Sequence, residues 1–457
     1  MKQFFYLLTA LLIISCNRSE RRSTDTDMVQ NVNTIDTIQL VNNFDPNFDF
    51  FFTYVDSFGD FIDFSKVDTT RKMITEMPYL ELTQSLTSEP VFWLRKGESY
   101  HIIGESNHIP LFQCATDTSM NEAVFFNKLY ENKIDLVYSF FNPDWKQIKK
   151  ELDENVYSLK AKERYEKKLA YLEEQKQNLS PYFYDLCTHF FKIDYLNKLF
   201  YSYHRNENDE SIKRILLSQK DSIQYDDLLF SKKYRDFCRI YSLFLSEIKS
   251  DSSVNTRYSI IKQNFSGKTR DYLLFETIKS HNPDENQLAM FYFDCNDETY
   301  KDYIKQELKA KTMLQSTNDS LLRTNLTIVG LSDLLSNYKG KWIYMDFWAS
   351  WCAPCRDLFP ASLKLKDKYG KDIIFVYISI DENTNQWQKA LKYEKLDENH
   401  CFLLSKNSDF VKKHKIKSIP RYMLFDKNGI LVDDNALRPD DNQWDEKIKM
   451  LVNKSSK

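Results

Sequence analysis

Glycine is scarce in this chain, with 8 residues in 457, against a usual share of about 7%. Because glycine supplies most backbone turns with positive φ, its scarcity favours long helices over much of the chain. The sequence also lacks any Cys/His cluster with the spacing of a zinc site. Its net charge is −3, so it lacks the excess of basic residues that is typical of nucleic-acid-binding proteins. We therefore expect no metal site, no cofactor and no nucleic-acid partner.

Long apolar runs are also missing, except at the start of the chain. Phe4 to Ile14 is apolar apart from Thr9, but it is shorter than the ~20 residues of a membrane-spanning helix. This length suits the apolar part of a secretory signal. The run ends at Ser15-Cys16, which resembles a bacterial lipobox and implies a lipidated Cys16 at the start of the mature chain. The alternative is an ordinary signal peptide with an incidental cysteine.

Residues 16–34 are polar and show no apolar periodicity, which predicts a flexible tether. The protein is therefore expected in the periplasm, attached to a membrane by its lipid. Asn17 stands where lipoproteins retained in the inner membrane often carry aspartate, and this favours the outer membrane.

The chain after the signal, about 440 residues, is too long for one hydrophobic core and predicts two or three domains. Residues 35–118 predict a small β domain. There, YLELTQSL alternates apolar and polar residues, PVFWLRKGESYHIIG predicts two strands around a turn at Lys96-Gly97, and IPLFQCAT is a further candidate strand. Residues 119–318 predict a helical domain, and residues 319–457 predict a third domain of mixed strands and helices.

The helical domain is expected to contain six to eight helices. NEAVFFNKLYENKI and KERYEKKLAYLEEQKQNL have apolar residues at helical spacing, and the second also carries charges at i,i+4. SPYFYDLCTHFFKIDYLNKLFYSYH is apolar around much of its circumference and starts at Ser180-Pro181, so it is the expected central helix. Further helices are predicted in YRDFCRIYSLFLSEI, TRDYLLFETI and YKDYIKQELKAKTML. Aromatic residues form 15% of the chain, and we interpret them as core rather than as a binding groove.

Strands and helices alternate in the third region. KDIIFVYISID is apolar without alternation, as in a central parallel strand. NQWQKALKYEKL and SDFVKKHKI are predicted helices, the second with Ser408 as its cap, and PRYMLFDKNGILVDD predicts a hairpin that turns at Lys427-Asn428-Gly429. DNQWDEKIKMLVNK predicts a closing amphipathic helix. The lysine-rich VKKHKIKSIP is interpreted as a solvated helix face rather than as a patch that stabilises a thiolate.

Cys352 and Cys355 form a C-x-x-C pair between an apolar strand, WIYMDFW, and a helix, CAPCRDLF. A helix N-terminus favours negative charge, so the pKa of the Cys352 thiol should fall below its free value of ~8.5. The thiolate is the attacking species, which makes Cys352 the predicted nucleophile and Cys355, one turn along, the predicted resolving thiol. Pro354 stiffens the loop between them, and Pro360 is expected to kink the helix near its start.

The segment DFWASWCAPC, preceded by LSDLLSNYKGKW, resembles thioredoxin and, more closely, exported thiol–disulfide oxidoreductases of the TlpA/ResA type. The resemblance covers residues 321–455 and implies a thioredoxin-like α/β/α fold for this domain. The whole chain is then a multidomain α+β protein, with a small N-terminal β domain and a central helical region. The resemblance also implies a cis peptide bond before Pro420 and a role in substrate binding for Trp351, Ile419 and Pro420.

Asp346 lies six residues before Cys352, on the same side of the strand as Trp348 and opposite Phe347. Thioredoxin has a buried acid at this position, whereas many exported relatives have asparagine, so this chain departs toward the thioredoxin pattern. Burial would raise the pKa of the carboxyl group and suit it to accept the proton of Cys355 as a general base. The alternative is an aspartate at the strand edge, exposed to water.

Five other cysteines stand alone in apolar surroundings, and we expect buried, inert thiols there rather than structural disulfides. They are Cys114, Cys187, Cys238, Cys295 and Cys401.

The sequence thus predicts a lipid-anchored periplasmic thiol–disulfide oxidoreductase that reduces disulfides of exported proteins. Reduction is favoured over oxidation because Ala353-Pro354 lacks the histidine that strongly oxidising members of the fold often carry between the cysteines. Such a reductant needs a membrane electron donor to recharge it, which the sequence does not identify. The alternatives are a ligand- or partner-binding lipoprotein in which the dithiol is a sensor or a remnant, and a disulfide isomerase or oxidant.

Overall fold

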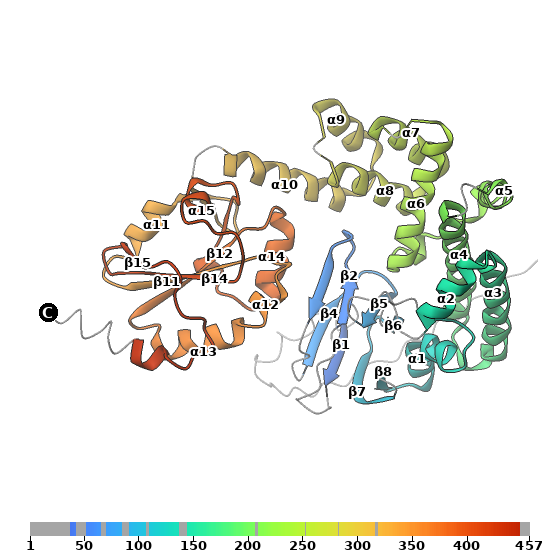
Figure 1. Ribbon diagram of the computed structural model, residues 1–457, viewed down its shortest axis with the longest axis horizontal. Coiled ribbons are helices and arrows are strands. Elements are labelled where there is room, and N and C mark those ends of the chain that lie inside the picture. Colours follow the sequence, from blue (N-terminus) through green and yellow to red (C-terminus); the bar gives the residue numbers. More distant parts are fainter. Residues whose placement is uncertain are drawn as a thin grey trace, which may run out of the picture.

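The computed structural model describes residues 37–42, 52–64, 70–84, 91–106, 109–136, 144–205, 209–251, 253–281, 283–315 and 319–447. Within these ranges the chain forms a β domain, a helical domain and a mixed domain, in sequence order (Figure 1). The predicted signal segment, lipidation site Cys16 and tether lie outside the described residues. No helix in the described ranges is both long and apolar enough to cross a membrane.

The β domain consists of two four-stranded sheets, ordered β4-β1-β7-β8 and β3-β2-β5-β6. Its strands are β1 (Thr37–Asn42), β2 (Phe52–Val55), β3 (Phe61–Phe64), β4 (Thr70–Ile74), β5 (Tyr79–Gln84), β6 (Val91–Arg95), β7 (Ser99–Ser106) and β8 (Ile109–Cys114). Both sheets contribute to one apolar cluster, with Ile38 from the first and Leu82 and Phe92 from the second. The predicted turn at Lys96-Gly97 joins β6 to β7. These strands belong to different sheets, so the turn connects the two sheets.

The helical domain has ten α-helices among its described residues, so the expected six to eight are too few. They are α1 (Asp117–Glu131), α2 (Asp144–Asp153), α3 (Tyr157–Glu174), α4 (Pro181–Arg205), α5 (Glu210–Ser218), α6 (Lys232–Ile248), α7 (Val254–Asn264), α8 (Gly267–Lys279), α9 (Glu285–Asp294) and α10 (Glu298–Gln315). All six helices expected from the sequence are present. The four missed ones are α2, α5, α7 and α9, of only 9 to 11 residues each.

Helix α4 is the centre of the helical domain, as its sequence predicts. It starts where expected, because Pro181 has no N–H to leave unpaired and the Ser180 hydroxyl accepts the Phe183 N–H at 3.2 Å. Around it the aromatic residues form a core: the ring of Trp93, from β6, lies 4.8 Å from the rings of both Phe190 and Phe230. The aromatic residues around Trp93 are thus core, as interpreted, and they also join the β domain to the helical domain.

The mixed domain is built on a seven-stranded sheet, ordered β10-β9-β13-β12-β11-β14-β15. Its elements are β9 (Ser320–Leu322), β10 (Ile328–Gly330), α11 (Leu331–Asn337), β11 (Trp342–Trp348), α12 (Ala353–Arg356), α13 (Phe359–Tyr369), β12 (Ile373–Ser379), α14 (Thr384–Tyr393), β13 (Cys401–Leu404), α15 (Asp409–Lys413), β14 (Arg421–Phe425) and β15 (Leu431–Asp433). Strand β11 pairs in parallel with β12 and antiparallel with β14, and all seven of its residues are buried.

Helices cover both faces of this sheet, which gives the predicted α/β/α arrangement. On one face, the odd-numbered residues of β11 pack against α11 and α15. On the other face, Tyr344 and Trp348 of β11 pack against α13 and α14. The predicted hairpin β14–β15 is present, with Gly429 at φ +79° in its turn, and Ser408 caps α15 by accepting the Val411 N–H. Half of the predicted closing helix, residues 448–454, lies outside the described residues.

Helix α14 connects the mixed domain to the helical domain. The carboxylate of Glu307, on α10, accepts the backbone N–H groups of Thr384 and Asn385 at 3.1 and 2.8 Å. These N–H groups belong to the first turn of α14 and have no partner within the helix, so Glu307 caps it from another domain.

The β domain contacts the same helix through the turn between β2 and β3. There Asp60 pairs with Lys389 of α14 at 3.2 Å and with Lys279 of α8 at 2.5 Å. Burial raises the pKa of Asp60, but the two ammonium groups outweigh it and hold the pKa below its usual value. One aspartate thus contacts cations from both other domains.

Candidate active site

Cys352 and Cys355 lie where β11 ends and α12 begins, and they form a disulfide bond. Cys352 is 4% exposed and Cys355 is 1% exposed. The Cys352 carbonyl accepts the N–H groups of Cys355 and Arg356, both at 3.1 Å, which closes the first turn of α12. Both cysteines are therefore buried, Cys352 slightly less than Cys355, and the pair is in the oxidised state.

The expected single helix after Cys352 is in fact two. Helix α12 ends at Arg356, and α13 starts at Phe359 with Pro360 in its first turn. Because proline has no N–H and its ring clashes with the preceding turn, the helix restarts at this point rather than bending through it. The sequence correctly predicts an irregularity at Pro360, but it predicts a kink where the structure has a break between two helices.

Asp346 is buried beneath this region, on the side of the sheet that packs against the cysteines. It is 2% exposed and lies opposite Tyr377 of β12 and Tyr422 of β14. Burial raises the pKa of its carboxyl group well above the usual value, and its Oδ1 atom has no hydrogen-bond partner in the described part of the chain. This contradicts the alternative of a water-exposed aspartate. Its role as a proton acceptor stays a prediction.

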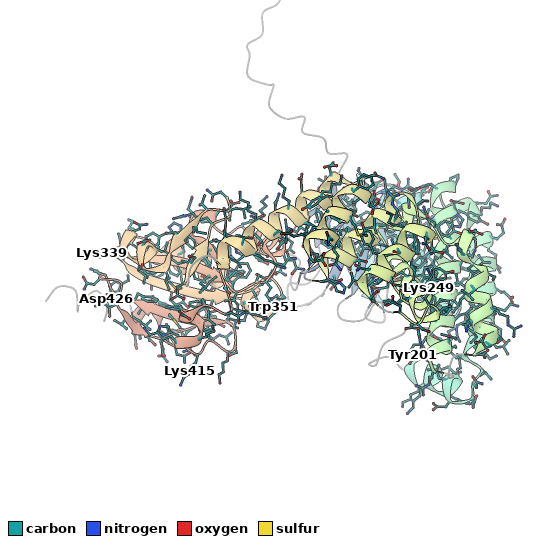
Figure 2. All side chains as sticks on the ribbon, turned by 90° about the horizontal axis from the view of Figure 1, so that it is seen from above. Tyr201, Lys249, Lys339, Trp351, Lys415 and Asp426 are labelled. Atoms are coloured by element: carbon teal, nitrogen blue, oxygen red, sulfur yellow. A yellow bond between two sulfur atoms is a disulfide. The ribbon has the colours of Figure 1, made fainter. Side chains whose placement is uncertain are left out.

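The residues expected to bind substrate lie on two segments: Trp351 directly precedes Cys352, and Ile419 packs against the apolar cluster that contains both cysteines. Ile419-Pro420 is a cis peptide bond directly before β14, as the resemblance implies, and both residues are half-buried. Trp351 is 65% exposed. Figure 2 shows Trp351 at the end of the mixed domain that is nearer to the other two domains. Substrate binding by these three residues stays a prediction.

Asp381 is a residue of this site that the sequence reasoning missed. It follows β12, and its carboxylate accepts the Ser350 N–H at 2.8 Å and the hydroxyls of Ser350 and Ser379 at 2.6 Å each. Burial raises the pKa of Asp381, although these hydrogen bonds partly offset the increase. Asp381 thereby holds the turn that leads into Cys352. The only signal in the sequence was an acid at the carboxyl end of a central strand.

Arg356, directly after Cys355, is a second missed residue. Its guanidinium group pairs with Glu394 at 2.7 Å and lies 5.2 Å from the centre of the Tyr393 ring. Tyr393 in turn packs against the apolar cluster of the β domain. The helix turn that carries both cysteines is therefore linked, through Arg356, to the contact between domains.

The remaining described cysteines are free thiols, as expected. Cys187, Cys238, Cys295 and Cys401 are buried, and burial raises the pKa of each. Cys114 is only half-buried, so the expectation of burial is less well met there.

Known proteins match this chain in the region of the cysteine pair. A family model described as thioredoxin-like matches residues 340–431. The chain is 27% identical over 138 residues to the thioredoxin-like protein YneN of Bacillus subtilis, covering 29% of this chain and 76% of that protein. It is 24% identical over 154 residues to the thiol-disulfide oxidoreductase ResA of Bacillus cereus, covering 34% of this chain and 86% of that protein.

Among solved structures, the chain is 35% identical to a Bacteroides vulgatus protein assigned as a thiol-disulfide oxidoreductase, covering 31% of this chain and 93% of that one, with a TM-score of 0.27. A TM-score this low carries no argument about the fold. The assignment of the C-terminal domain as thioredoxin-like therefore rests on the family model and the sequence relatives. Each of these matches covers about a third of this chain or less.

Proposed function

Since its C-terminal domain belongs to the thioredoxin-like family of thiol–disulfide oxidoreductases, we propose that this protein reduces disulfide bonds of exported proteins from a lipid anchor in the periplasm. The observation that carries the proposal is the Cys352–Cys355 disulfide at the end of β11, above the buried carboxyl group of Asp346. A neighbouring pair of thiols that closes into a disulfide can take up the two oxidising equivalents of a substrate disulfide.

The reaction starts from the reduced protein. The Cys352 thiolate attacks one sulfur of the substrate disulfide, and a new Cys352–substrate bond forms as the first substrate thiolate leaves. Cys355 then attacks the Cys352 sulfur, which expels the second substrate thiolate and closes the Cys352–Cys355 disulfide. The substrate gains two electrons, the protein loses them, and both released thiolates take up protons.

Asp346 supports the second step. A carboxyl group without water around it has a raised pKa, so its carboxylate form is a stronger base than that of an exposed aspartate. It accepts the proton that Cys355 must lose before it attacks, and it passes that proton to the departing thiolate. The position of Cys352 at the N-terminus of α12 favours its thiolate form.

Insulin reduction tests the activity. With dithiothreitol as electron source, we expect the full chain to accelerate precipitation of the insulin B chain and Cys352→Ser to abolish the acceleration. Cys114→Ser, which removes a half-buried thiol outside the motif, is the matched control and should retain full activity. Equal activity of the Cys352→Ser protein would refute the proposal.

The direction of electron flow is tested separately by equilibrium with glutathione. A reductant should have a potential near the value of about −270 mV of thioredoxin, whereas a strong oxidant lies near about −120 mV. A value close to the second would replace the proposed reduction with oxidation.

The lipid anchor is supported by the apolar run that ends at Ser15-Cys16. We expect radiolabelled palmitate to enter the wild-type protein and not Cys16→Ala, and the wild-type protein to sediment with outer membranes. A protein that carries no label, or that sediments apart from membranes, would remove the anchor from the proposal and leave the thiol chemistry unaffected.

A further inference from the structure

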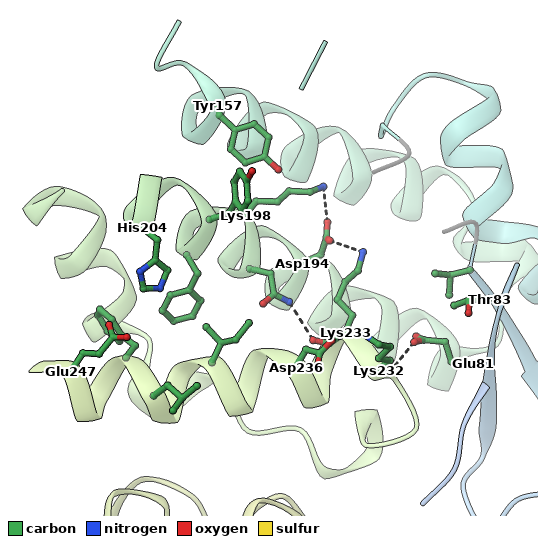
Figure 3. A pocket seen from close by; sticks show the side chains of 17 residues that line it. Glu81, Thr83, Tyr157, Asp194, Lys198, His204, Lys232, Lys233, Asp236 and Glu247 are labelled. Carbon is green, nitrogen blue, oxygen red and sulfur yellow. Dashed lines mark hydrogen bonds and ion pairs between the residues drawn. The ribbon is translucent and has the colours of Figure 1, made fainter. Parts of the chain in front are cut away.

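Two groups of lysine residues differ in the partners that they have. The first group lines a cavity of about 510 Å³ between α4 and α6 (Figure 3). There Lys198 and Lys233 each pair with Asp194 at 2.9 Å, and Lys232 pairs with Asp236 at 2.5 Å. These lysines are thus matched by acidic residues of the same wall.

The second group belongs to the mixed domain, at the end of α15 and in the segment that leads to β14. It consists of Lys412, Lys413, Lys415 and Lys417, and we call it the basic surface. All four residues are exposed, which agrees with the solvated face that the sequence predicts. None of the four forms an ion pair or a side-chain hydrogen bond with another residue in the described part of the chain.

The described acidic residues that lie near the basic surface each have a partner. Asp319 and Asp434 are close enough to act on His414, which lies between the lysines. Asp319 accepts a backbone N–H of α15 at 2.7 Å, and Asp434 lies 3.8 Å from the guanidinium group of Arg421. Asp409, in the first turn of α15, also has an interaction partner. Four lysines and Arg421 therefore stand against three aspartates, so the basic surface keeps an excess of positive charge.

The basic surface adjoins the segment expected to bind substrate. Lys417 precedes Ile419 by two residues, and Ile419 packs against the apolar cluster that contains Cys352 and Cys355. Ile416 is buried against the opposite face of the sheet and holds this segment in place. Because an extended chain advances about 3.3 Å per residue, residues a few positions from a substrate cysteine can reach the lysines.

From the unpaired charge and its position we propose that the basic surface selects substrates whose disulfide is flanked by acidic residues. This inference rests on the proposed function and adds the class of substrate to it. The ammonium groups attract aspartate and glutamate side chains of the substrate, so they favour its encounter with Cys352 and leave the sulfur chemistry unchanged. The position beside Ile419 favours a substrate over an anionic lipid surface, because the reaction brings a substrate to that segment.

Three disulfide peptides test the proposal. They share one disulfide and differ only in the flanking residues, which are glutamate, serine or lysine. With the reduced full chain in stopped flow at low salt, we expect the glutamate peptide to react at least about tenfold faster than the lysine peptide. The ratio should approach one at high salt, because salt screens exposed charges. Equal rates at low salt, or a preference that salt does not change, would overturn the proposal. Failure of all three peptides to react would refute the proposed function itself.

Two double variants locate the selection. Lys415→Glu with Lys417→Glu should lower the rate of the glutamate peptide about tenfold relative to the serine peptide. Lys339→Glu with Lys427→Glu is the matched control and should keep the wild-type order of rates. Both of its lysines are exposed, and Lys339 lies at the end of the mixed domain opposite Trp351 (Figure 2).

Two results would contradict this location. One is a preference for the glutamate peptide that survives Lys415→Glu with Lys417→Glu, or that the control loses equally. The other is binding of phosphatidylglycerol vesicles that depends on Lys415 and Lys417, together with equal rates for the three peptides. That second result would assign the basic surface to the membrane instead.

Discussion

Asp346→Asn is the substitution that tests the buried state of this carboxyl group most directly. Asparagine has almost the same shape as a protonated aspartic acid but does not titrate. In the native protein Asp346 is buried, its Oδ1 atom has no hydrogen-bond partner among the described residues, and burial raises its pKa well above the usual value. In the unfolded chain the same group is solvated and returns to a pKa of about 3.9.

The sign and size of the effect follow from proton linkage. Between the unfolded pKa and the raised native pKa, the native state of the wild-type protein holds one more proton than the unfolded state. Its stability therefore falls by about 1.4 kcal/mol for each unit of rising pH in that window. The stability of the Asp346→Asn protein does not have this dependence on pH, because asparagine does not titrate. From pH 5 upward we expect Asp346→Asn to gain stability over the wild type, by about 1.4 kcal/mol for each pH unit up to the pH at which the native carboxyl group ionises.

The assay is native-state hydrogen exchange of the slowest amides of β11, followed by mass spectrometry on the full chain, because a protein of several domains does not unfold in one step. Comparing the two proteins at each pH cancels the intrinsic exchange rate. Asp367→Asn, on the exposed side of α13, is the control for the substitution itself. A difference between Asp346→Asn and wild type that stays constant from pH 5 to pH 7 would refute the reasoning.

Three further outcomes are expected. Asp346→Asn should slow insulin reduction about a hundredfold, the lower end of what general acid–base catalysis supplies, and rapid quenching should show a longer-lived mixed disulfide; an unchanged rate would contradict the proton-acceptor role. Asp381→Ala removes the acceptor of the Ser350 N–H and hydroxyl, so it should destabilise the turn before Cys352 by about 1–3 kcal/mol, seen as faster hydrogen exchange there. Lys389→Ala removes one of two cations beside Asp60 and should speed exchange at residues 56–60 while leaving β11 unchanged.

The chemistry of the mixed domain was predictable because its signals are local. The cysteine spacing, the flanking strand and helix, and the proline before β14 each lie within a few residues, and strand alternation alone placed Asp346 on the same face as Trp348. Asp381 was not predictable, because its partner Ser350 comes from another strand end, 31 residues away. Its role depends on the order of strands in the sheet, which the sequence does not state.

The sequence does not show which charged residues are buried by tertiary contacts. Lys168 lies in a run with charges at i,i+4 spacing, which is typical of a solvated helix face, yet it is 3% exposed between Asp135 and Asp194. Both acids come from other segments of the chain, and their charges make its burial possible. For the same reason no sequence pattern indicated the cavity between α4 and α6, which exists only once the two helices pack.

Trapping the mixed disulfide tests the central claim most directly. The full-length Cys355→Ser protein, reduced and mixed with a disulfide peptide, should accumulate a covalent adduct, and peptide mapping should place it on Cys352. The Cys352→Ser protein should accumulate none. An adduct carried by Cys355, or equal amounts of adduct on both variants, would contradict the assignment of Cys352 as the attacking thiol and Cys355 as the resolving one.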